Sequence, residues 1–166
     1  MDPLFAWVEA SWPSRWLRES LSIFAFPMVL TLHTLGLALL AGSSSALCLR
    51  LLGVARQVPV GALAPLLSLA WCGFWLNAVT GLALVWAYPT KALTNLLFYG
   101  KLALVALGVV LLLRLRRHCA GGPASPAPER TRATRRLAAL LLGTWVAAIF
   151  AGRFLAYTYQ RLLVGH

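Results

Sequence analysis

LSIFAFPMVLTLHTLGLALLAGSSSALCL, residues 21–49, contains no formally charged side chain. A run of about 20 apolar residues is long enough to cross the hydrocarbon core of a bilayer as a helix. The rest of the chain has the same character: of its 166 residues 60% are hydrophobic and 11% are charged, and the mean hydropathy is +0.78. A soluble domain carries about a quarter charged residues. The composition therefore predicts an all-α integral membrane protein with no room for a separate soluble domain.

Four apolar segments of this kind follow one another along the chain. They predict transmembrane helices at about residues 22–48, 62–88, 95–113 and 137–157. We therefore expect a four-transmembrane-helix bundle as the one folded domain, over residues 21–166.

The first twenty residues, MDPLFAWVEASWPSRWLRES, differ from the spans in being rich in both tryptophan and charge. Tryptophan prefers the headgroup level of a membrane, and four apolar residues recur at roughly helical spacing: Leu4, Phe5, Val8 and Trp12. Residues 1–20 are therefore predicted to form an interfacial amphipathic helix. Asp2 and Glu9 stand where a signal peptide would be positive, so we expect the segment to remain on the mature protein.

A basic segment at about residues 114–136 separates the third predicted span from the fourth. It holds one acid, Glu129, and seven arginines: Arg114, Arg116, Arg117, Arg130, Arg132, Arg135 and Arg136. Its centre, GGPASPAP, is typical of a flexible linker. By the positive-inside rule this loop is predicted to be cytoplasmic, which places both chain termini on the outer side. The net charge of +11 thus indicates orientation and contact with anionic lipids, and not nucleic-acid binding, because the arginines gather at helix ends.

The most informative single residue is His33, about 15 Å along a helix from Ser22 at 1.5 Å per residue. With alternating helix directions, Asn77 falls near the same depth, and Lys101 and Arg153 fall in the outer half of the same bundle. The four acids all lie outside the predicted spans: Asp2, Glu9, Glu19 and Glu129. Buried cations without buried anions predict a bound anion, snorkelling side chains or residues of a partner.

A haem b fits this pattern. Neutral imidazole ligates haem iron, so His33 is the predicted metal ligand, and Lys101 and Arg153 could pair with the propionates. Aromatic residues of the spans would cover the macrocycle: Phe26, Trp71, Phe74, Trp75 and Phe98. The spans offer one histidine, because His118 and His166 lie in a loop and at the chain end. The iron would then be five-coordinate, take Lys101 as a weak ligand, or take a histidine from a second chain.

Each of these residues also has an explanation that needs no cofactor. His33 could hydrogen-bond a backbone carbonyl, Asn77 or Thr80; Lys101 could snorkel outward; Arg153 could anchor its helix at the interface. Two stripes of small residues predict close helix packing. They are Gly73, Asn77 and Gly81 in the second span, and Gly143, Ala147 and Ala151 in the fourth.

The order of short motifs resembles that of a family of small uncharacterised bacterial four-helix membrane proteins. The motifs are FP-x5-H-x2-GLALLAG, LRLLG, GF-x5-TGLAL and FYGKLAL, within residues 22–118. More distantly, the histidine of the first span and the lysine of the third resemble HemJ-type protoporphyrinogen oxidases and CopD-like membrane domains. This resemblance implies a bacterial inner-membrane protein, and it implies haem b binding with His33 and Lys101 as the key residues.

The sequence thus predicts a haem b-associated integral membrane subunit that takes part in electron transfer. Its predicted site is His33, Lys101, Asn77 and Arg153, and its predicted partners are other membrane subunits or further copies of itself, with quinone as a candidate. Two alternatives stay open. One is a cofactor-free accessory subunit of a larger membrane complex; the other is a HemJ-like protoporphyrinogen oxidase.

Overall fold

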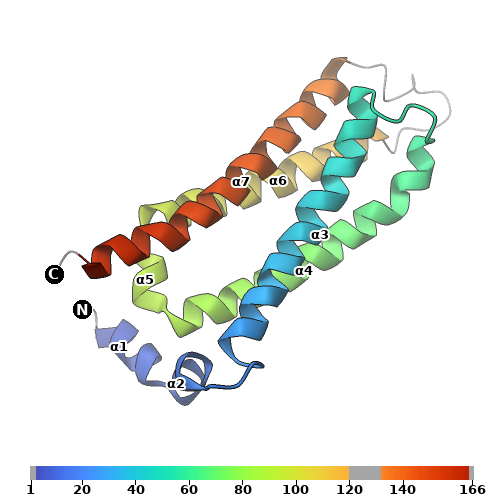
Figure 1. Cartoon of the computed structure of the whole chain (residues 1–166). Helices are drawn as coiled ribbons and strands as arrows, with labels where there is room; N and C mark the ends of the chain where they lie inside the picture. The colour runs from blue at the N-terminus through green and yellow to red at the C-terminus, as the bar shows by residue number, and fades with distance from the viewer. Residues whose placement is uncertain (1–2, 120–131, 165–166) are drawn as a thin grey trace.

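The part of the chain that the structure describes contains four long helices, each long and apolar enough to cross a membrane. The computed structural model describes residues 3–119 and 132–164. The long helices are α3 (Phe26–Leu52), α4 (Ala64–Ala87), α6 (Leu96–Cys119) and α7 (Arg132–Val164). Figure 1 shows them running lengthwise side by side, and the described residues contain no β-strand. The predicted all-α four-helix architecture is confirmed.

The helices extend beyond the predicted spans at the basic end of the bundle. α6 continues through the arginines to Cys119, and α7 already begins at Arg132. Most of the arginines assigned to a loop at residues 114–136 therefore lie on helices, since arginine is a good helix former. The GGPASPAP linker and Glu129 lie outside the described residues.

Short helices fill the connections. They are α1 (Pro3–Ala10), α2 (Trp12–Glu19), the 3-10 helix η1 (Val60–Leu63) and α5 (Pro89–Leu93). The predicted amphipathic segment is thus two helices, because the backbone of Ser11 is extended and Pro13 begins a new first turn. Pro27 and Pro65 occupy the first turns of α3 and α4, and Gly53 ends α3 in a left-handed conformation with φ of 111°.

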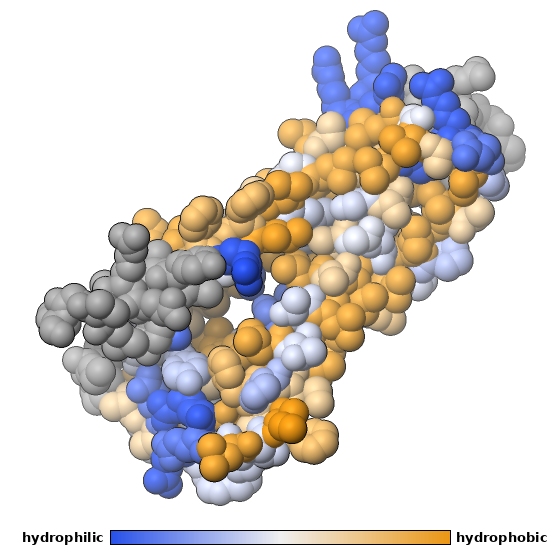
Figure 2. All heavy atoms as spheres, in the orientation of Figure 1, coloured by the Kyte–Doolittle hydropathy of each residue, from blue (hydrophilic) through white to orange (hydrophobic). Residues whose placement is uncertain are grey.

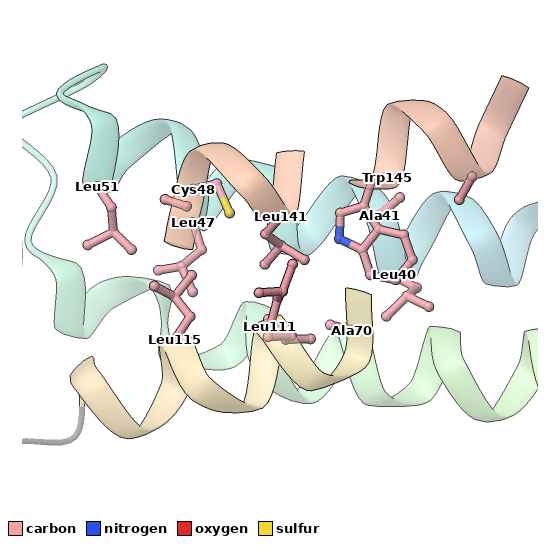
Figure 3. Close-up of a cluster of buried hydrophobic side chains, with 13 residues drawn as sticks. Leu40, Ala41, Leu47, Cys48, Leu51, Ala70, Leu111, Leu115, Leu141 and Trp145 are labelled. Atoms are coloured by element: carbon pink, nitrogen blue, oxygen red, sulfur yellow. The ribbon is translucent and has the colours of Figure 1, made fainter. Parts of the chain in front are cut away.

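The bundle is built from two closely packed pairs, α3 with α4 and α6 with α7, which are joined mainly through α3 and α7. The apolar core lies in the half of the bundle nearest the basic end (Figure 3). It includes Leu40 and Leu51 of α3, Leu115 of α6 and Trp145 of α7, each at most 1% exposed. Trp145 reaches this position because Gly108 of α6 leaves room for its ring: a Cβ there would lie 2.8 Å from the indole.

The other half of the bundle is more open. Figure 1 shows α7 diverging from α3 and α4 toward the end that carries α1, α2 and α5, and Figure 2 shows the surface hollowed between the two pairs, with strongly hydrophilic atoms at the rim. All the residues of the main core on α3 follow Leu39, so His33 lies outside it. The site residues predicted from the sequence belong to this more open half of the bundle.

Helices α1 and α2 cover the end of α4 and the start of α5. The buried hydroxyl of Ser14 donates to the carbonyl of Ala87 at 3.3 Å, and the Trp86 indole N–H donates to Ser11 at 3.3 Å. The Glu9 carboxylate accepts the backbone N–H of Thr90 at 3.4 Å. Lys91 lies 4.9 Å from the centre of the Tyr88 ring, and burial lowers the pKa of its ammonium. Trp7 and Trp12 remain 72% exposed, which suits a segment that meets lipid headgroups.

Candidate functional site

The site begins with an unusually close crossing of α3 and α4. A Cβ on Gly36 would lie 2.6 Å from the backbone nitrogen of Asn77, and a Cβ on Gly73 would lie 2.6 Å from that of Leu40. No side chain fits at either point, so the two backbones are in direct contact. The predicted stripe of Gly73, Asn77 and Gly81 does lie on this contact, because Asn77 is buried and a Cβ on Gly81 would lie 3.1 Å from the His33 ring.

At this crossing His33 and Asn77 bind one another reciprocally. The Asn77 side-chain amide donates to the His33 carbonyl at 2.7 Å, and Nδ1 of His33 lies 3.1 Å from the Asn77 carbonyl. Each side chain therefore bonds the main chain of the opposite helix. Such bonds are possible only where the backbones are this close, and they fix the direction of the imidazole ring.

The Asn77 carbonyl decides where the ring carries its proton, because a carbonyl can only accept a hydrogen bond. The Thr80 hydroxyl, 3.1 Å from Nδ1, is compatible with this arrangement, since it has the Leu76 carbonyl at 2.6 Å as its own acceptor. A neutral ring in this position has its proton on Nδ1 and its lone pair on Nε2.

The lone pair on Nε2 faces Lys101. The Lys101 amine, on α6, lies 3.2 Å from Nε2 and donates to it. The lysine chain also lies against α7, since a Cβ on Gly152 would be 3.7 Å from its Cε. Lys101 therefore connects the two helix pairs in the half of the bundle that the apolar core does not fill.

Three of the four predicted site residues are thus brought together: His33, Asn77 and Lys101. Arg153 follows the glycine that touches Lys101, but its own side chain is exposed and makes no hydrogen bond to the other three in the described part of the chain. The contacts that sequence reasoning missed are those of Gly36 and Gly152. A search for glycines at matching depths on two helices could have indicated the contact at Gly36. No feature of the sequence around Gly152 indicates its contact with Lys101.

The aromatic residues that the sequence assigned to a macrocycle cover contact nearby rings. Phe74 of α4 contacts both Trp71 and Trp75 edge to face, and the Trp75 side chain is 63% exposed. Phe26 instead contacts Tyr88. These ring contacts leave the predicted cover of a macrocycle by the five residues as a prediction.

The second predicted small-residue stripe, on α7, makes no close helix contact at Gly143 within residues 3–119 and 132–164. Gly143 and Ala147 are exposed, and a Cβ on Gly143 would meet no atom within 4 Å. The face that packs instead carries Leu141, Trp145 and Ala148. Small residues permit close packing, but the larger apolar residues on the neighbouring face decided the rotation of α7.

The arrangement can hold a ligand through one lone pair and one cation. Metal-binding histidines generally donate their other ring N–H to a carbonyl or a carboxylate, as Nδ1 of His33 is placed to do. The described residues contain no group of three or more His, Cys, Asp or Glu side chains that could hold a metal ion. Comparisons with protein-family models, with curated proteins and with solved structures found no match to this chain.

Proposed function

We propose that this protein is a haem b-associated integral membrane subunit that takes part in electron transfer. The observation that carries the proposal is the fixed imidazole of His33: Nδ1 lies 3.1 Å from the Asn77 carbonyl, and the Nε2 lone pair faces the Lys101 amine. When bound, haem b supplies one-electron transfer within the membrane.

The residues present fit such a group in three respects. The hollow between the helix pairs would provide space, Nε2 of His33 would be the nitrogen that holds the iron, and Lys101, when protonated, would provide a positive charge for a propionate. Iron ligation requires the Lys101 amine to move from its position 3.2 Å from Nε2, and its four-carbon stem allows this. The protein's own part is to orient the ring and to keep it neutral.

The test is the absorption spectrum of the protein purified from cells supplied with haem, oxidised and then reduced with dithionite. We expect a Soret band from the wild type and from His118→Ala, and no band from His33→Ala. His118 is the matched control because it is exposed at the basic end, where its ring bonds the Arg114 carbonyl. A colourless wild type, or a pigment that survives His33→Ala, would refute the proposal.

A cofactor-free accessory subunit is the second candidate. It is favoured by a specific observation, namely that both ring nitrogens of His33 already have protein partners, Asn77 with Thr80 on one side and Lys101 on the other. This function predicts a colourless protein that co-purifies with a larger assembly, and a loss of stability in His33→Ala without spectral change.

A HemJ-like protoporphyrinogen oxidase is the third candidate, supported by the direct contact between His33 and Lys101. Complementation of a bacterial strain that lacks this oxidase tests it. We expect growth only with both residues intact. Growth with either His33→Ala or Lys101→Ala would exclude this activity.

We also propose an orientation, in a bacterial inner membrane with both termini outside. The support is the uneven charge of the two ends: the exposed arginines of α6 and the start of α7 lie at one end, and Glu9 and Glu19 lie at the other. A reporter enzyme that is active only outside the cytoplasm, fused after His166, should be active. An inactive fusion that is made in normal amounts would reverse the assignment.

A further inference from the structure

At the basic end of the bundle, two arginine side chains are hydrogen-bonded to the main chain. Two exposed guanidinium groups are held on neighbouring main-chain carbonyls at the end of α3. Arg56 donates through Nε to the Gly53 carbonyl at 3.2 Å, and Arg135 of α7 donates through Nη2 to the Leu52 carbonyl at 3.4 Å. Because the two carbonyls belong to consecutive residues, both guanidinium groups are fixed at the same end of α3.

A third arginine shapes the turn beneath them. Arg50 is 7% exposed; its Nε donates to the Val58 carbonyl, and its Nη2 donates to the Arg56 carbonyl at 2.9 Å. The turn that carries Arg56 is therefore folded around a buried positive charge. Three guanidinium groups outweigh the partial negative charge at the end of a helix, which is about half an elementary charge.

Within the described part of the chain, the two exposed arginines make no contact with a carboxylate. Neither Arg56 nor Arg135 forms an ion pair there, and the two described acids, Glu9 and Glu19, belong to α1 and α2 at the opposite end. Figure 2 shows hydrophilic side chains gathered at the basic end. Each exposed guanidinium donates one hydrogen bond to a carbonyl and has further N–H groups that can donate to a ligand. Because the guanidinium groups are positively charged, they favour an anion as that ligand.

The height of the two arginines in the membrane points to the source of that anion. The apolar span of α3 ends at Leu52, and the span of α7 begins at Arg132. Arg56 and Arg135 therefore lie where lipid headgroups lie, next to the apolar surface that acyl chains cover. Guanidinium groups bind phosphate oxygens in a forked geometry, which a pair fixed on one turn can present.

We propose that Arg56 and Arg135 form a binding site for the phosphate of one anionic phospholipid. A headgroup without a positive charge, as in phosphatidylglycerol, suits the site. Phosphatidylcholine carries the same phosphate but adds an ammonium group, which three neighbouring arginines repel. The site is independent of any haem.

Native mass spectrometry of the detergent-purified full chain, titrated with phosphatidylglycerol or phosphatidylcholine of equal acyl chains, tests this site. We expect one phosphatidylglycerol to be retained preferentially by the wild type. The variant Arg56→Gln/Arg135→Gln should bind it about 30-fold more weakly, from about fivefold per arginine at a membrane surface. The control variant Arg116→Gln/Arg117→Gln removes the same charge from exposed arginines of α6 that hold no main-chain carbonyl, and it should lose less than about threefold.

Three results would overturn the site. They are equal losses in the two double variants, equal retention of the two lipids by the wild type, and displacement of the lipid by an equal concentration of glycerol phosphate, which would make a soluble phosphate the ligand. Should the double variant fail to fold by circular dichroism, Arg135→Gln alone removes only one long bond to Leu52 and should still weaken binding about fivefold. Unchanged binding in that single variant would also refute the proposal.

Discussion

Replacing Gly36 by alanine should separate α3 from α4 and disconnect His33 from Asn77. The new Cβ would lie 2.6 Å from the Asn77 backbone nitrogen, whereas ordinary contact begins at 3.4 Å, so the helices must part by about 0.8 Å. The reciprocal hydrogen bonds of 2.7 and 3.1 Å would then lengthen to about 3.5 and 3.9 Å, beyond a useful bond. Overpacking costs about 1–3 kcal/mol, and two interhelical bonds contribute about 0.6 kcal/mol each. We expect the free energy of unfolding to fall by about 2–4 kcal/mol.

The assay is equilibrium unfolding in mixed micelles with increasing dodecyl sulfate, followed by circular dichroism. Gly42→Ala is the matched control, because Gly42 lies on the same helix and a Cβ there meets no atom within 4 Å. That variant should be unchanged or more stable by up to about 1 kcal/mol, since alanine favours helix over glycine. Equal stability of the two variants would refute the reasoning, because it would mean that the backbones are not in contact at Gly36.

Three further perturbations test other parts of the structure. Arg50→Gln should lower the free energy of unfolding by about 2–3 kcal/mol, because it removes charge-assisted hydrogen bonds that hold the turn at residues 53–58. Proteolysis of that turn should become faster. An unchanged rate of proteolysis would contradict the role of Arg50. Ser14→Ala should lower the free energy of unfolding by about 1 kcal/mol and loosen α2 from the end of α4. Amide hydrogen exchange in residues 12–19 should become faster, and unchanged exchange would contradict this contact. Gly108→Ala places a Cβ 2.8 Å from the Trp145 ring, so it should lower the free energy of unfolding by about 1–3 kcal/mol and shift the tryptophan fluorescence. A melting temperature equal to that of Gly143→Ala would count against the described core.

Some of the candidate site follows from the sequence and some does not. Helix period and alternating direction were enough to expect His33 and Asn77 at one depth, because both follow from counting residues along spans. The same reasoning did not identify the packing face of α7, because the stripe at Gly143 lies on an exposed face of that helix. The depth of a residue in the membrane depends on its position along one helix. The direction in which its side chain points depends on how that helix is rotated against its neighbours. That rotation is decided by all the contacts together.

The order of residues is enough to predict four helices long and apolar enough to cross a membrane, since apolar length and missing charge are local properties that need no partner. The same reading predicts a histidine far from the ends of the first span, with no acid in any span. The partners of this histidine follow from the folded bundle alone: its Nδ1 side meets Asn77 and Thr80, and its Nε2 meets Lys101. The reason is physical: these bonds exist because Gly36 and Gly73 let two backbones touch, and a contact between residues some forty positions apart depends on the matching of two surfaces and not on either helix alone.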